Sequence, residues 1–129
     1  MCVQLNPAWS ITGPGITAET DGFASLDELD FTGSQQTAIC KFFFGTAVVS
    51  DGAIESFARG VQAPSPGLVL EMNLGNSNWS ASNGQSGTLT DAQVEDVGAA
   101  LGAGQAAFKA AVEQLALTLG ILPGSYVTG

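Results

Sequence analysis

The sequence predicts an α+β fold, with an antiparallel, β-rich N-terminal portion and a C-terminal helix or helix pair packed on it. The first observation behind this is a run of β-branched and aromatic residues, 37–49, followed by the turn pair Asp51-Gly52 and a second short run. The second is a capped, amphipathic pattern over residues 90–120. At 129 residues, we expect one domain covering 1–129.

The β-rich portion is expected to cover about residues 1–75. An Asp-Gly pair between two strand-like runs is a strong hairpin signal, because both turn positions need positive φ. Asp51 and Gly52 therefore predict a hairpin. Residues 67–74 then alternate between apolar and other side chains, which predicts a strand with one buried face. The side chains expected on that face are Leu68, Leu70, Met72 and Leu74.

Residues 76–88 are polar and predict either a loop or a small hairpin that turns at Asn83-Gly84. Trp79 is a large ring among these small polar residues. It either folds back onto the core or serves as an exposed contact for another protein, since Trp often dominates binding energy. Trp9, in the turn-rich region before the first long strand, is a second candidate contact residue.

The helical portion starts with a capping-box pattern, in which Thr90 is followed three residues later by Gln93. Apolar residues then recur at helical spacing up to Leu119, and Gly120 is expected to end the helix. Glycines inside a helix each cost up to about 1 kcal/mol relative to Ala. The three inside this pattern leave open one long helix or two helices with a break near Gly102–Gly104. Residues 121–129 are expected to form a C-terminal tail.

Small residues occupy every fourth position of this pattern, at Gly98, Gly102, Ala106 and Ala110. A helix face without large side chains lets another backbone approach closely. Such a face either packs on the protein's own sheet or meets the same helix of a second copy around a symmetry axis. The four residues are therefore candidate interface residues, together with the two tryptophans.

The charge balance excludes several partners. Twelve acidic residues stand against Lys41, Arg59 and Lys109, and the net charge is −9. Because nucleic-acid affinity comes mainly from Lys and Arg on phosphates, we predict no nucleic-acid partner. The same balance argues against anionic membranes. We also expect no transmembrane segment, since no uncharged apolar stretch reaches about 18 residues, and no signal peptide, because the first residues lack a basic start and an apolar run.

We predict no catalytic, cofactor-binding or metal-binding residue. The chain has no His, so a serine nucleophile would need Lys41 or Lys109 as its base, and neither lies in such a motif. Cys2 and Cys40 are too few for a zinc site; whether they form a disulfide stays open. The acidic segment 19–30 is expected to be a solvated loop, with a cation site or a contact for a basic partner as alternatives.

The sequence therefore favours a non-enzymatic structural or assembly protein, a small subunit that packs with copies of itself in a larger homo-oligomeric or hetero-oligomeric particle. Low charge, at 12% of residues, and the small-residue face support this prediction. A virion component, such as a phage capsid decoration or tail protein, is the concrete form, located in the virion or the cytoplasm. A soluble module that binds sugar or calcium is the alternative, and an unrecognised enzyme is a third class.

Overall fold

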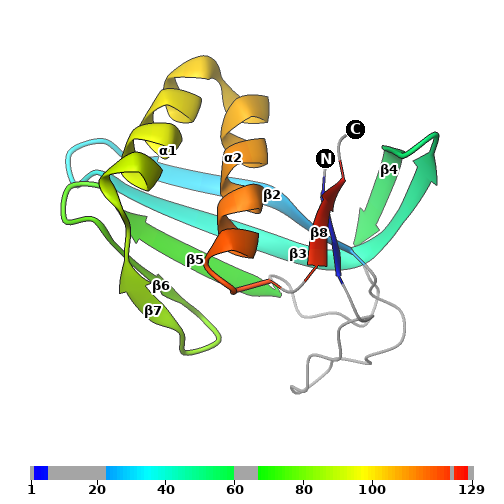
Figure 1. Cartoon of the computed structure of the whole chain (residues 1–129), viewed down its shortest axis with the longest axis horizontal. Helices are drawn as coiled ribbons and strands as arrows, with labels where there is room; N and C mark the ends of the chain where they lie inside the picture. The colour runs from blue at the N-terminus through cyan, green and yellow to red at the C-terminus, as the bar shows by residue number, and fades with distance from the viewer. Residues whose placement is uncertain (1, 6–22, 60–66, 123, 128–129) are drawn as a thin grey trace.

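The computed structural model describes residues 2–5, 23–59, 67–122 and 124–127. Eight strands form one antiparallel sheet, and two helices pack on it, which confirms the predicted α+β class (Figure 1). The strands are β1 (Cys2–Leu5), β2 (Phe23–Thr32), β3 (Thr37–Ser50), β4 (Ala53–Arg59), β5 (Leu68–Asn73), β6 (Asn78–Ala81), β7 (Ser86–Thr88) and β8 (Gly124–Val127). The helices are α1 (Asp91–Ala103) and α2 (Gln105–Thr118).

The strand order is β7-β6-β5-β3-β2-β1-β8, and β4 also pairs with β3. Gly45 of β3 pairs with Phe23 of β2 and with Arg59 of β4, so β4 lies on the edge of β3 that it shares with β5. The β3–β4 hairpin therefore extends past the part of the sheet that the helices cover (Figure 1). Its turn confirms the Asp-Gly prediction, with φ of 53° at Asp51 and 80° at Gly52.

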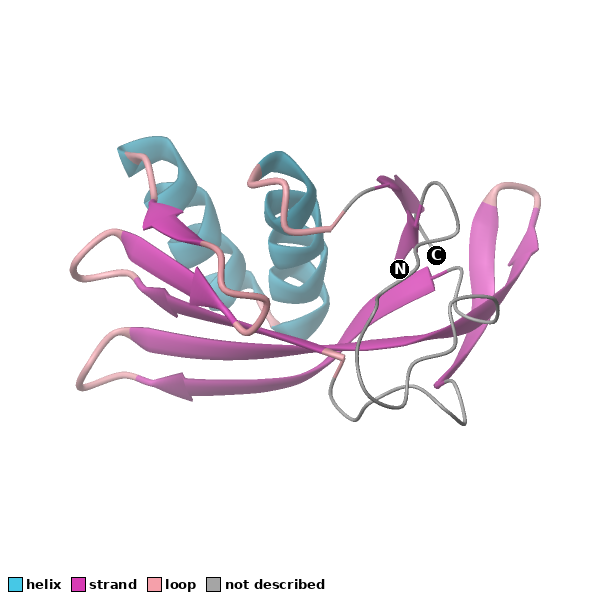
Figure 2. Cartoon of the chain, turned by 90° about the horizontal axis from the view of Figure 1, so that it is seen from below, coloured by secondary structure: helices cyan, strands magenta, loops and turns pink. Residues whose placement is uncertain are grey.

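Both helices lie on one side of the sheet, and the main core is between them and the strands (Figure 2). The alternation predicted for β5 is confirmed, because Leu68, Leu70 and Met72 are at most 2% exposed. Apolar side chains at alternate positions of β3 and on the inner faces of the helices complete this core. The largest that are fully buried are Phe42, Phe44, Val97, Phe108 and Val112.

The helical pattern forms two helices, the second of the two arrangements left open by the sequence. Thr90 caps α1 as predicted: its hydroxyl accepts from Gln93 N–H at 3.1 Å, and Gln93 Oε1 accepts from Thr90 N–H at 2.9 Å. The break falls at Gly104, whose φ of 121° is rarely adopted by residues with a side chain. This backbone conformation reverses the chain, so that α2 returns beside α1.

The polar stretch forms a small hairpin of β6 and β7. Trp79 is 8% exposed and belongs to the core, so its ring is not displayed at the surface. Gly87 of β7 makes room for it, because a Cβ there would lie 3.0 Å from Trp79 Nε1. Within the expected C-terminal tail, residues 124–127 form β8, which pairs with β1 along its whole length. The sequence of β8 does not by itself predict a strand, because its pairing depends on β1 at the other end of the chain.

Candidate functional site

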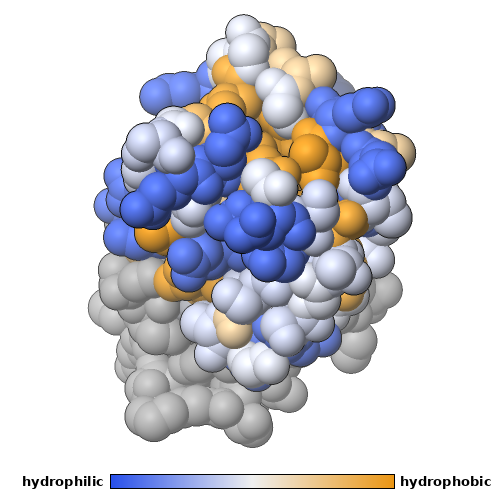
Figure 3. Space-filling view, turned by 90° about the vertical axis from the view of Figure 1, so that its left-hand side faces the viewer, coloured by the Kyte–Doolittle hydropathy of each residue, from blue (hydrophilic) through white to orange (hydrophobic). Residues whose placement is uncertain are grey.

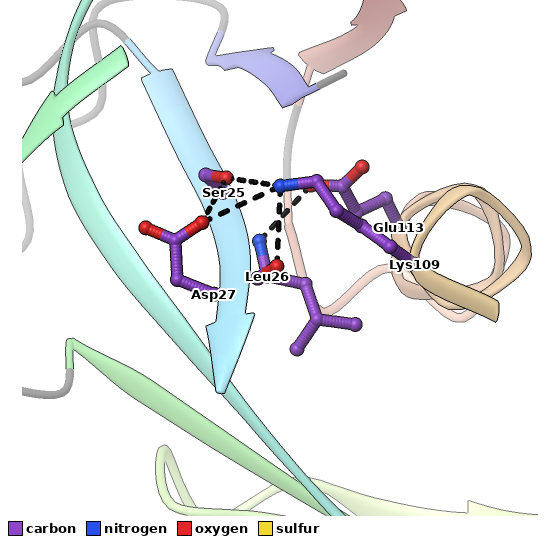
Figure 4. Close-up of polar contacts among 5 residues, drawn as sticks. All are labelled: Ser25, Leu26, Asp27, Lys109 and Glu113. Atoms are coloured by element: carbon purple, nitrogen blue, oxygen red, sulfur yellow. Dashed lines mark hydrogen bonds and ion pairs between the residues drawn. The ribbon is translucent and has the colours of Figure 1, made fainter. Parts of the chain in front are cut away.

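The candidate site lies where α2 meets the outer edge of β2. Along this edge, β1 pairs only with Phe23 and Ala24. At Leu26 the backbone is bound by α2 instead. The Leu26 N–H donates to Glu113 Oε2 at 3.0 Å, and the Leu26 carbonyl accepts from Lys109 Nζ at 3.1 Å (Figure 4). Two side chains of a helix thus satisfy the edge of a strand at the point where the neighbouring strand ends.

The Lys109 ammonium is surrounded by oxygen atoms. Besides the Leu26 carbonyl, it donates to Ser25 Oγ and to Asp27 Oδ1, the latter at 3.4 Å, and it lies 3.7 Å from Glu113 Oε2. The Ser25 hydroxyl in turn donates to Asp27 Oδ1 at 2.8 Å. The network forms because Lys109 and Glu113 are four residues apart on one helix face. A β-bulge between Leu26 and Glu28 adds Asp27 to the strand beside them.

Glu113 is fully buried, at 0% exposure, and its Oε1 atom has no hydrogen-bond partner among the residues that the structure describes. Burial raises the pKa of this carboxyl from 4.5 to about 7, against the opposite effects of the Leu26 N–H and the Lys109 charge. A buried acceptor without a partner costs about 1–3 kcal/mol. The site therefore holds a carboxyl group whose charge state changes near neutral pH.

An open groove of about 510 Å³ runs beside this network, between β2 and the start of α2. Its apolar floor comes from Leu26, Leu29 and Phe108, and its charged rim includes both acidic and basic residues. The rim residues are Asp27, Glu28, Asp30, Lys41, Gln105 and Lys109. The space-filling view of the end where β2 turns into β3 shows apolar surface between hydrophilic residues (Figure 3).

The acidic segment was expected to be a solvated loop, but its described residues, Asp27, Glu28 and Asp30, belong to β2 and line the rim. Glu19 and Asp21 lie outside the described residues. Glu28 is opposite Lys41 in the β2–β3 register, so the acidic residues of the rim have a cation on the neighbouring strand. Within the described ranges, no group of three or more His, Cys, Asp or Glu side chains comes close enough to hold a metal ion. Cys40 is a free, buried thiol, and burial raises its pKa to about 12.

Ser25 contacts Lys109, and a lysine is the base that a serine nucleophile would need in a chain without His. The geometry of this contact does not suit a nucleophile and base. Ser25 is 1% exposed, so a substrate could not reach its hydroxyl in this conformation. Lys109 Nζ is a hydrogen-bond donor to three oxygens, whereas a base needs a free lone pair. The network is better suited to fixing α2 against β2.

The candidate interface residues are divided between the two helices. Gly98 and Gly102 of α1 are exposed, and a Cβ added at either would meet nothing within 4 Å. Ala106 of α2 is exposed and Ala110 is half-buried. The small-residue face thus does not pack on the chain's own sheet, because the larger apolar residues occupy that side. Trp9 lies outside the described residues.

A second groove, of about 520 Å³, separates α1 from α2. Gln93, Asp96 and Val97 line it from α1. The lining residues of α2 are Ala107, Ala110, Ala111, Gln114, Leu115 and Thr118, half of them alanines.

Comparison with known proteins identifies no relative: no protein-family model, no curated protein and no solved structure matches the chain. Functional inference therefore depends on the residues and their geometry. Of the two described helices, neither is long and apolar enough to cross a membrane.

Proposed function

We propose that the chain is a non-enzymatic structural subunit that packs with copies of itself in a larger homo-oligomeric or hetero-oligomeric particle. A virion is the concrete setting, with a phage head decoration or tail protein as the kind of component. The observation that carries the proposal is the exposed small-residue surface of the helical layer. At Gly98 and Gly102 the α1 backbone faces open space, which leaves room for another chain to approach it closely.

The β3–β4 hairpin supports the same proposal. Its outer part is a two-stranded ribbon, and such a ribbon is at best marginally stable by itself in water. Val48 on this ribbon is 54% exposed, more than any other large hydrophobic residue in the described part of the chain; Phe31 follows at 36%. Contact with a neighbouring subunit would bury Val48 and stabilise the ribbon.

Charge limits the kinds of partner. Two of the three cations, Lys41 and Lys109, line the groove beside β2 among carboxylates. This arrangement leaves no basic surface for phosphates. Protein surfaces are therefore the proposed partners, and neither nucleic acid nor an anionic membrane belongs to the proposal.

A cation-binding module is the alternative with less support: Asp27, Glu28 and Asp30 line one groove, but within the described residues no three acidic side chains come close enough to hold a metal ion. Calcium accepts six to eight oxygen ligands, and a bound ion would stabilise the fold by mass action. A thermal midpoint that rises with calcium and falls again with EDTA would support this candidate. The sugar-binding version has less support, because the Trp79 ring is buried.

Light scattering of the purified chain across a range of concentrations tests the main proposal. A defined oligomer that dissociates on dilution is the expected result. A mass that stays at the 13.0 kDa of one chain at every concentration would contradict self-assembly and leave a cation-binding module as the candidate.

A further inference from the structure

The two edge strands of the sheet differ in what covers them. The strand order ends with β8 on one side and β7 on the other. β8 contacts α2, so a helix lies against that end. β7 pairs with β6 on its inner edge, and no described strand pairs with its outer edge. All three residues of β7 are exposed. An exposed strand edge is a template for pairing with another chain.

The hydrogen bonds at the ends of β7 establish which peptide groups face outward. Leu89 donates its N–H to Ser77 O at 2.7 Å, and Gln85 O accepts from Ala81 N–H at 2.8 Å. Both groups face β6. Since the peptide groups of successive residues in a strand point to opposite edges, Ser86 and Thr88 direct their N–H and C=O groups outward.

The distribution of charge favours a second copy of this chain as the occupant of that edge. Residues 72–90, which include β6 and β7, contain no charged side chain, although the whole chain has a net charge of −9. Two copies can therefore bring these edges together without opposing carboxylates at the strand. The unpaired stretch of β2 is different, because it carries Glu28 and Asp30 after a bulge, and charges and bulges are features that block edge pairing.

The surface of α1 beside this edge also accommodates a second copy. Because α2 contacts β1, β2 and β8, α1 occupies the β6–β7 side of the helical layer (Figure 1). Gln93, Asp96 and Val97 face α2 across their groove. About half a helical turn away, Gly98 and Gly102 face away from α2, and neither has an atom within 4 Å of an added Cβ.

We infer that two copies pair through their β7 strands, antiparallel and around a two-fold axis at Gly87, and so form one continuous sheet. In this register Ser86 of each copy is opposite Thr88 of the other. Each such pair exchanges two backbone hydrogen bonds. The α1 helices then lie on either side of the axis with their glycine faces inward. This inference rests on the proposed function, because the β7 edge would be one interface of the proposed assembly and a second copy would be the partner.

The test uses Ser86→Pro, because proline is tolerated at an edge strand when its N–H would face outward. The substitution removes one outward donor from each copy and leaves the bonds to β6 in place. The dimer therefore loses two hydrogen bonds, one from each copy. With about 1 kcal/mol lost per hydrogen bond, we expect the dimer dissociation constant to rise about 30-fold. The double variant Ser86→Lys/Thr88→Lys, which places like charges at the edge, should also dissociate the dimer. Ser34→Lys/Gln35→Lys in the exposed turn between β2 and β3 is the control for two added charges and should have no such effect.

Hydrogen exchange gives an independent measurement on the wild-type protein. The amide protons of Ser86 and Thr88 should be protected in concentrated samples and lose that protection on dilution. Leu89, whose N–H is bonded within the chain, should stay protected in both. An oligomer that neither variant dissociates, with Ser86 and Thr88 exchanging freely, would overturn the β7 interface and leave the proposed function standing. A wild-type chain that is monomeric throughout would overturn both. If Ser86→Pro fails to fold, the lysine variant and hydrogen exchange decide.

Discussion

Replacing Glu113 with Gln should stabilise the protein above neutral pH and have little effect near pH 5. The ordinary pKa of 4.5 rises to about 7 in the folded chain, chiefly through burial. The folded state therefore binds a proton more tightly than the unfolded state does. The stability of the wild-type protein must then fall as pH rises from about 4.5 to 7, and the full loss is present above 7.

The size of this effect follows from the same values. Each pKa unit corresponds to about 1.4 kcal/mol, so the rise from 4.5 to about 7 corresponds to a loss of about 3 kcal/mol at alkaline pH. Glutamine has nearly the same shape and no charge to bury, and its amide oxygen can still accept from Leu26 N–H. We therefore expect Glu113→Gln to be about 3 kcal/mol more stable than wild type at pH 8.

Urea unfolding at pH 5, 6, 7 and 8 measures this difference. The matched control is Glu95→Gln on α1, the same chemical change at an exposed position, which should shift stability by no more than about 0.5 kcal/mol at every pH. A Glu113→Gln difference that stays constant from pH 5 to pH 8, or that reverses sign, would refute the assignment of the titration to this carboxyl.

Four further substitutions test the packing. Lys109→Met removes the only described cation near Glu113 and should destabilise the fold by about 3 kcal/mol at pH 8 and by less at pH 5, in the same urea titration. Gly104→Ala forces a residue with a side chain to φ of 121° and should lower the free energy of unfolding by about 1–3 kcal/mol. Gly98→Ala, in open space within α1, should instead stabilise the isolated chain by up to about 1 kcal/mol. The thermal midpoints of the two variants should therefore move in opposite directions. Gly87→Ala places a Cβ 3.0 Å from Trp79 Nε1 and should cost about 1–3 kcal/mol with a change in tryptophan fluorescence.

Features with a local cause could be predicted from the sequence. The Asp51-Gly52 hairpin depends on two residues that tolerate positive φ, and the start of α1 depends on the capping pair Thr90 and Gln93. Both signals lie within a few residues of the structure that they produce. The break between the helices was only partly predictable, because three glycines were candidates and tertiary packing selects Gly104.

The α2–β2 network could not be predicted in this way, because its partners are more than 80 residues apart. Its position depends on where β1 stops pairing and on the bulge beside Asp27, and both depend on the assembled sheet. One signal was nevertheless present. Lys109 and Glu113 are the only charged residues in α2, and they are four residues apart in an otherwise apolar or neutral helix. A single opposite-charge pair at that spacing points to a specific partner across the core.

The placement of charge connects the network to the proposed assembly. At the β2 edge, where a further strand could add beyond β1, the chain uses a buried acid and a cation to bind the peptide group of Leu26, with Glu28 and Asp30 farther along. At the β7 edge it has no charge at all, and the outward peptide groups of Ser86 and Thr88 are bound to nothing in the described chain. Since like charges at a strand edge prevent pairing and an uncharged edge permits it, the fold blocks addition at β2 and permits it at β7. A pair formed through β7 would occupy that edge in both copies, so growth beyond the proposed pair must use other surfaces, such as the β3–β4 hairpin or the groove between the helices.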